Sequence, residues 1–132
     1  MRMQAVYYRD EDGNEPVSDF IDALPPPAQE ELDFKINMLN RLSPDDSPLA
    51  FPHSSQVDGQ LRELRCHYGR TLYRILYQRS NNLFVLLHIV AKRSQQLAES
   101  DKAIARVRWD DFKARMDAPR RQPPRAVGHD AP

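Results

Sequence analysis

The sequence predicts one α+β domain, and three observations lead to this class. The chain has 132 residues, a length that suits one hydrophobic core better than two. Apolar residues between 60 and 91 alternate or run together in short stretches separated by turn residues, which predicts three consecutive strands. Apolar residues at helical spacing lie before and after this block. The expected order is β-α-α-β-β-β-α, a mostly antiparallel sheet packed by helices on one side.

The N-terminal third predicts one strand and two helices. Residues 3–8 are rich in β-branched and aromatic side chains and predict the first strand. Asn14 is expected to cap a short helix that stops at the three prolines 25–27. Its apolar residues share one face: Val17, Phe20, Ile21 and Leu24. A second helix is expected from about Pro27 to Leu42, followed by a polar loop over residues 43–59.

The middle of the chain predicts a meander of strands over 60–68, 71–79 and 83–91. Tight turns are expected at Gly69-Arg70 and at Asn81-Asn82, where asparagine suits positive φ. Strand alternation separates the side chains of the first of these strands into two faces. One face carries Arg62, Leu64, Cys66 and Tyr68, and the other carries Leu61, Glu63, Arg65 and His67.

The C-terminal third predicts one helix and a tail. The helix is expected from about Asp101 to Met116, capped by Ser100. Its apolar stripe is Ala105, Trp109, Phe112 and Met116, and such a stripe is more often core than a ligand site. Residues 118–132 are rich in proline and arginine without periodicity, so we expect one folded domain over 1–117 and a disordered tail over 118–132.

Composition limits the classes of function. The formal net charge is zero, yet residues 51–96 carry seven bases and two acids, which predicts a local basic face suited to phosphate. No apolar run is long enough to span a membrane, and no signal peptide is recognisable. The single cysteine, Cys66, cannot form an internal disulfide, and this favours a cytoplasmic location. No metal-ligand spacing is present, so neither a metal nor a cofactor is expected.

Five short motifs follow one another between residues 63 and 95. They are Glu63-Leu64-Arg65, Tyr68-Gly69, Tyr73-Arg74-Ile75-Leu76-Tyr77, Leu87-His88 and Lys92-Arg93-Ser94-Gln95. In this order and spacing they resemble the RelE/ParE toxin superfamily, in particular its HigB-like, phage-derived branch. The resemblance covers roughly residues 3–116. It implies the toxin of a type II toxin–antitoxin pair, which cleaves mRNA on the ribosome and binds a helix-turn-helix, HigA-like antitoxin.

The residues themselves support RNA cleavage without a metal. Such an enzyme activates a ribose 2′-hydroxyl, stabilises a doubly negative phosphorane and protonates the leaving 5′-oxygen. A turn centred on Gly69-Arg70 places Arg65 directly across from Arg74, and two like charges there favour an anion between them. We therefore predict Arg65 and Arg74 as catalytic, with His88 and Lys92 as further catalytic candidates.

Four more residues are predicted to bind the RNA: Arg62, Arg93, His53 and Tyr68. The catalytic candidates have structural alternatives: Glu63 can neutralise the arginine pair, and His88 can be a satisfied, half-buried histidine. Tyr73 and Tyr77 alternate with the core and are expected to be buried. Two other functions remain open at this point: a ParE-like inhibitor of DNA gyrase on the same fold, and a non-catalytic phage-derived protein that only binds an antitoxin.

Overall fold

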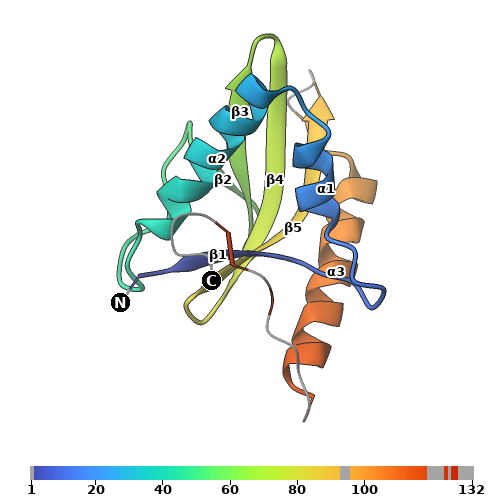
Figure 1. Cartoon of the computed structure of the whole chain (residues 1–132). Coiled ribbons are helices and arrows are strands. Elements are labelled where there is room, and N and C mark those ends of the chain that lie inside the picture. The colour runs from blue at the N-terminus through green and yellow to red at the C-terminus, as the bar shows by residue number, and fades with distance from the viewer. Residues whose placement is uncertain (1, 93–95, 119–123, 125, 128–132) are drawn as a thin grey trace.

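The computed structural model has a five-stranded sheet at its centre, with the strand order β1-β5-β4-β3-β2 (Figure 1). It describes residues 2–92, 96–118, 124, 126 and 127. The strands are β1 (Gln4–Tyr7), β2 (Ser54–Asp58), β3 (Leu61–Tyr68), β4 (Thr71–Ser80) and β5 (Leu83–Lys92). β1 pairs with β5 in parallel, and the other three pairings are antiparallel. The predicted α+β class and mostly antiparallel sheet are therefore confirmed.

Three helices pack on this sheet: α1 (Pro16–Asp22), α2 (Pro26–Asn40) and α3 (Glu99–Met116). Each begins close to its predicted position, but the predicted caps are wrong. Glu15 precedes α1 and Ala98 precedes α3, in place of Asn14 and Ser100, and neither makes a side-chain capping bond. Proline in the first turn of α1 supplies a preset φ where no amide donor is needed.

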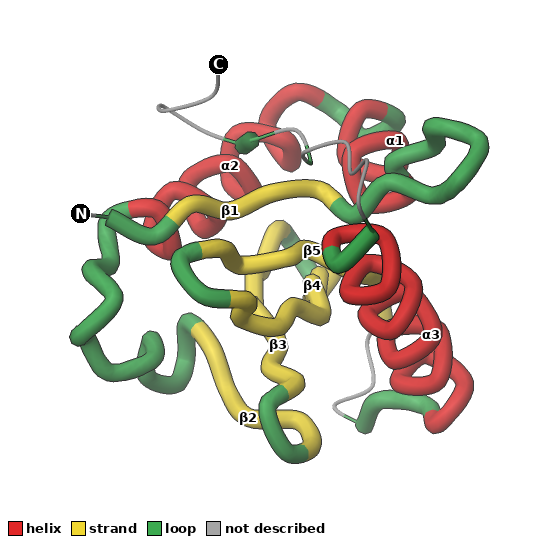
Figure 2. The backbone as a smooth tube through the Cα atoms, turned by 90° about the horizontal axis from the view of Figure 1, so that it is seen from below, coloured by secondary structure: helices red, strands yellow, loops and turns green. Residues whose placement is uncertain are grey.

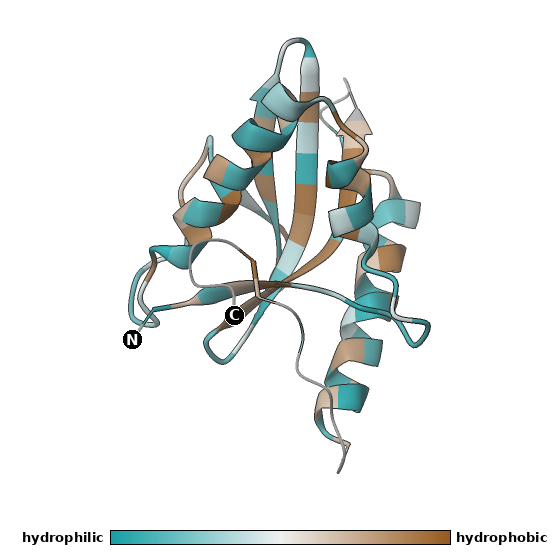
Figure 3. Ribbon diagram, in the orientation of Figure 1, coloured by the Kyte–Doolittle hydropathy of each residue, from teal (hydrophilic) through white to brown (hydrophobic). Residues whose placement is uncertain are grey.

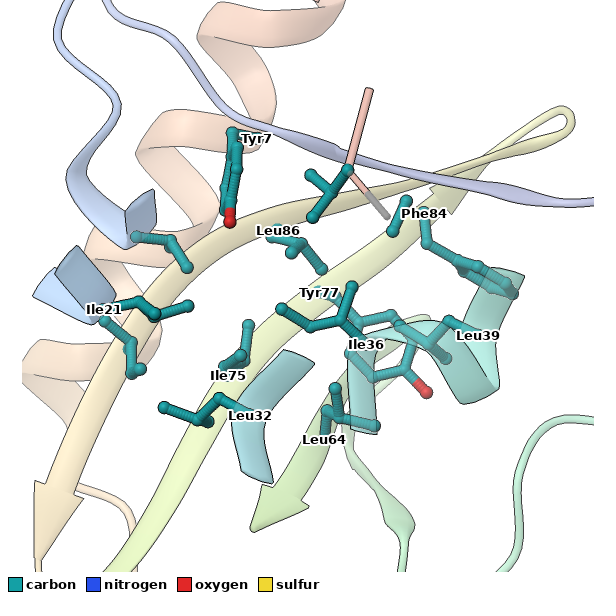
Figure 4. Close-up of a cluster of buried hydrophobic side chains, with 14 of the residues drawn as sticks. Tyr7, Ile21, Leu32, Ile36, Leu39, Leu64, Ile75, Tyr77, Phe84 and Leu86 are labelled. Carbon is teal, nitrogen blue, oxygen red and sulfur yellow. The ribbon is translucent and has the colours of Figure 1, made fainter. Parts of the chain in front are cut away.

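The helices cover two faces of the sheet, which corrects the prediction of helices on one side. The first core lies between the sheet and the α1–α2 pair, and Figure 4 shows its centre, including Leu32, Ile36, Leu64, Ile75 and Leu86. The second core lies under α3, which Figure 2 shows apart from α1 and α2. It contains Val6, Tyr8, Leu61, Leu76, Val85, Leu87, Ala105 and Phe112. The predicted α3 stripe is thus core, with Trp109 and Met116 packed at its margin.

Alternation along each strand explains this two-sided burial. Ile75 and Tyr77 face the first core, whereas Leu76 between them faces the second. Figure 3 shows hydrophobic colour along much of β5 and in separate bands on β4, with a hydrophilic band between them on β4 and hydrophilic colour at the hairpin turns. Cys66 is 1% exposed within the first core, as predicted, and burial raises the pKa of its thiol to about 11.

Strand β2 was not predicted, because its sequence Ser-Ser-Gln-Val-Asp lacks the apolar alternation of a half-buried strand. It forms an edge of the sheet against β3, and the residues expected to be loop there pair Ser54 with Leu64 and Gln56 with Arg62. An edge strand with one covered side needs few apolar residues.

The C-terminal segment departs from the expectation of a structureless tail at Ala126 and Val127, which are 9% and 7% exposed. Ala126 forms an antiparallel bridge with Val6, on the side of β1 away from β5. The Val127 amide donates to the Ala5 carbonyl at 2.8 Å. These two residues therefore cover the outer edge of β1, and Val127 joins the first core.

Candidate functional site

The centre of the candidate site is a pair of arginines on neighbouring strands. The register of β3 and β4 places Arg65 directly opposite Arg74, as predicted from the Gly69-Arg70 turn. Tyr68 pairs with Thr71 across that turn, and Gly69 has φ +60°. Directly opposed residues on antiparallel strands have Cβ atoms about 4.5–5.5 Å apart. The two side chains lie on the α3 side of the sheet, since they alternate with first-core residues Leu64, Cys66, Tyr73 and Ile75.

A single carboxylate lies against both arginines. Arg65 Nη1 donates to Glu63 Oε1 at 3.1 Å, and Arg74 Nε is 3.4 Å from Glu63 Oε2. Ser55 Oγ also donates to Glu63 Oε1 at 2.8 Å. Glu63, Arg65 and Arg74 are 6%, 8% and 3% exposed, so this charge cluster is nearly buried. Glu63 offsets one of the two positive charges, and the three side chains together retain an excess of one.

An open pocket of about 230 Å³ reaches this cluster. Glu63 and Arg74 form part of its wall, and Gln56, Val57, Gln96, Leu97, Glu99 and Lys102 form the rest. Lys102, in the first turns of α3, lies 3.1 Å from Glu99 and adds a cation to this wall. The pocket therefore joins the charge cluster to solvent at a place where an anion would meet more than one cation.

A larger hollow of about 350 Å³ lies elsewhere, between α1, α2 and the C-terminal segment. Its wall includes the carboxylates of Asp22 and Asp33. Burial, together with the charges of Asp22 and Glu30, raises the pKa of Asp33. An acidic hollow repels a phosphate, so its size does not make it the better candidate for an RNA site.

His88 lies one row along the sheet from the arginine pair. It is opposite Leu76, which in turn is opposite Glu63, so His88 is also on the α3 side. Its Nε2 is 2.9 Å from Asp101 Oδ1, and Arg108 Nη1 lies 3.3 Å from its Nδ1. Arginine only donates, so Nδ1 accepts and Nε2 carries the proton toward Asp101. Both ring nitrogens are therefore engaged, and proton transfer between Nδ1 and a bound ligand would require the longer Arg108 contact to open.

The fold does not bring Arg62 to the arginine pair. Its side chain points to the opposite face, where Nη2 donates to the Leu49 carbonyl at 2.9 Å and to Ser54 Oγ at 3.1 Å. Its Nε donates to the hydroxyl of Tyr77, itself 1% exposed, at 3.4 Å. The Arg62 guanidinium thus ties the loop before β2 to the sheet.

The remaining predicted residues are scattered. His53 is half-buried beside α2, with Nδ1 2.8 Å from Lys35 Nζ. Tyr68 is 37% exposed at the end of β3. The backbone of Lys92 pairs with Leu72 at the end of β5, but its side chain, like all of Arg93, lies outside the described part of the chain.

The sequence did not indicate two residues that contact the ring of His88, Asp101 and Arg108. Asp101 is 9% exposed near the start of α3, and Arg108 lies two helical turns farther along. Burial lowers the pKa of Arg108, which also donates to the Leu87 carbonyl at 2.8 Å. The available signal was their spacing of seven residues on one helix, which places both on the face toward β5.

Within the residues described, no three of His, Cys, Asp or Glu are placed to hold a metal ion. No helix in the same part of the chain is long and apolar enough to cross a membrane.

Comparison with known proteins gives one family. Residues 19–110, well over half of the chain, match the family model described as "Phage derived protein Gp49-like (DUF891)". The matched region runs from α1 into α3 and contains the arginine pair, Glu63, His88 and Asp101. No curated protein matches the chain.

Proposed function

Because the chain belongs to the Gp49-like family of phage-derived proteins, a RelE-like toxin family of type II toxin–antitoxin systems, we propose that it is a metal-independent, ribosome-dependent mRNA endonuclease. Its partner would be a helix-turn-helix, HigA-like antitoxin, its substrate mRNA on translating ribosomes, and its effect the inhibition of translation in the cytoplasm.

The observation that carries this proposal is the Arg65–Arg74 pair sharing Glu63 beside an open pocket. Cleavage of RNA by its own 2′-oxygen builds negative charge on the scissile phosphate. Two guanidiniums fixed by a sheet offer planar, permanently charged donors for that phosphate. Because the Glu63 carboxylate holds both guanidiniums, the two arginines need no reorganisation when negative charge develops on the phosphate.

Proton transfer is the second requirement, and His88 is the histidine next to the pair on the same face. Asp101 orients its ring through Nε2. The 3.3 Å contact from Arg108 to Nδ1 is long for a hydrogen bond and is the one that substrate would replace. Lys92 follows on the same strand and is proposed to hold the RNA backbone or the leaving oxygen.

A non-catalytic, antitoxin-binding protein is the second candidate, and a specific observation favours it. Both His88 ring nitrogens and both site arginines already have partners within the fold. A residual binding protein keeps such contacts because they stabilise its structure.

The test is induced expression with mapping of mRNA 5′ ends. Wild type should produce new ends within coding regions. Arg65→Ala should reduce them by about 10²–10³-fold, the usual cost of one lost electrostatic contact to a transition state. Arg65→Lys should recover only part of the loss, because lysine keeps the charge but not the planar pair of donors.

Arg70→Ala is the matched control, since it removes one positive charge from an exposed site at the same hairpin. It should leave cleavage unchanged. Growth inhibition without new mRNA ends would reject the endonuclease, and blocked DNA supercoiling under those conditions would point to gyrase. Absence of toxicity, with tight binding to a helix-turn-helix protein encoded nearby, would favour the non-catalytic candidate.

A further inference from the structure

Phe51 is the most exposed large hydrophobic side chain in the described part of the chain, at 69%. It lies in the turn that leads into β2 and belongs to neither hydrophobic core. The Arg65 guanidinium carbon lies 5.0 Å from the centroid of its ring. The Phe51 ring therefore has a cation–π contact with Arg65 and leaves most of its surface open to a ligand.

The backbone fixes this ring relative to the arginine pair. The Ala50 carbonyl accepts the amides of His53 at 3.0 Å and Ser54 at 3.2 Å, which closes the turn containing Phe51. The His53 carbonyl in turn accepts the Arg65 amide at 2.8 Å. The turn is therefore bonded through its backbone to the residue whose guanidinium the ring contacts.

We propose that Phe51 is a stacking platform for one nucleobase of the RNA, next to the phosphate held by Arg65 and Arg74. This inference rests on the proposed function. A nucleotide has a flat base and a negative phosphate a short distance apart. Phe51 and Arg65 have an aromatic face and a positive charge at a similarly short separation, so one nucleotide could contact both. The excess positive charge around Glu63 favours this ligand over an apolar protein surface.

Stacking on a phenyl ring has a consequence for substrate choice. Every base has a π face, but purines offer more area than pyrimidines, so a stacking contact selects by strength rather than by hydrogen bonding. The stacked position should therefore show a purine preference in the wild-type cleavage sites, and this preference should weaken when the ring is removed.

Four variants test the proposal by mapped mRNA 5′ ends and their initial rates of formation. Phe51→Ala should lower cleavage by about 5- to 150-fold, the range expected for one stacked base, and should flatten the base preference at one position. Phe51→Tyr should keep both the rate of cleavage and the base preference. Phe51→Leu, which keeps apolar bulk without a π face, should behave like alanine. Phe34→Ala is the matched control, because Phe34 is 58% exposed on α2, which packs on the face of the sheet opposite to the arginine pair.

The outcomes separate this inference from the proposed function. A wild type that makes no new ends rejects the endonuclease and the platform with it. A wild type that cuts, with Phe51→Ala cutting at the same rate and with the same preference, rejects the platform alone. Leucine restoring full cleavage, or Phe51→Ala losing only antitoxin binding in co-purification, also overturns the proposal in favour of a hydrophobic protein contact. Thermal melts of each variant confirm that the fold is retained.

Discussion

Replacing Glu63 by glutamine tests how the fold tolerates two arginines face to face. The substitution keeps the size of the side chain and an oxygen for Ser55 and Arg65, so packing changes little. It removes the only negative charge that is paired with both Arg65 and Arg74 among the described residues. Two nearly buried like charges then remain on directly opposed positions.

The magnitude follows from the distances. At 3.1 Å, one unit-charge pair is worth roughly 5 kcal/mol at an effective dielectric constant of about 20, and the second pair at 3.4 Å is similar. The cost of removing the charged groups from water cancels part of this attraction. Breaking a buried ion pair by removing one partner typically costs about 3–5 kcal/mol of stability. In a domain of this length, that corresponds to a fall in Tm of about 10–20 °C.

The assay is thermal and urea unfolding of purified variants. Glu63→Gln combined with Arg65→Met should regain much of the loss, because the opposed charges are no longer both present. Glu99→Gln is the control: it removes a carboxylate that is 81% exposed and pairs with Lys102, and it should leave Tm unchanged. A Glu63→Gln melt within 2 °C of wild type, roughly the resolution of such a comparison, would refute the reasoning, as would a double variant no more stable than the single one.

Three further expectations follow from other parts of the molecule. Deleting residues 124–132 should lower the free energy of unfolding by about 1.5–3 kcal/mol, the value of burying a valine such as Val127; an unchanged urea midpoint would contradict this. Cys66 should react with Ellman's reagent only on unfolding, and a native protein that reacts at once at pH 8 would contradict the burial of its thiol. The free energy of unfolding should also fall as the pH rises above the pKa of the thiol in the unfolded chain toward its folded pKa of about 11. In that range the folded state holds a proton that the unfolded state has lost. Finally, mRNA cleavage should survive chelation of divalent ions down to the level that ribosomes need, and loss of cleavage with intact ribosomes would reject the metal-free mechanism.

The strand meander was predictable because local chemistry determines its register. Gly69 and Asn81 take positive φ, of 60° and 53°, at two-residue turns, and each turn aligns the strand residues next to it. A bulge then shifts the β4–β5 register by one residue between Leu76 and Tyr77, and the sequence did not predict this shift. Once Tyr68 is opposite Thr71, every pair follows by counting, including Arg65 opposite Arg74. The arginine pair was therefore accessible from the sequence without any knowledge of the helices.

The partners of the site residues were harder to predict, because they depend on which helix covers which face. The positions of Asp101 and Arg108 around His88 follow only from α3 lying on the face opposite to α1 and α2. Apolar periodicity shows that a helix has a buried stripe but does not say on which side of a sheet it packs. For the same reason, the exposure of Phe51 over Arg65 could not be read from a loop sequence.

The C-terminal segment shows how a single polar side chain can organise structure that periodicity does not reveal. Asn40 is fully buried at the end of α2, where its Oδ1 accepts the Ala5 amide at 2.7 Å and its Nδ2 donates to the Val127 carbonyl at 2.7 Å. The side-chain amide thus presents to β1 and to the segment the same donor and acceptor that another strand would offer. A buried amide needs both partners, so Asn40 requires that something cover the β1 edge.

Asn40→Leu should therefore release residues 126 and 127 and expose the Ala5 amide to hydrogen exchange, whereas the same substitution at the neighbouring, half-buried Asn37 should not. If exchange at Ala5 is the same in both variants, the segment is held by its other contacts, which are Val127 packing, the Val127–Ala5 backbone bond and the Gln4 side-chain bond to the Val127 carbonyl, and Asn40 does not determine its position.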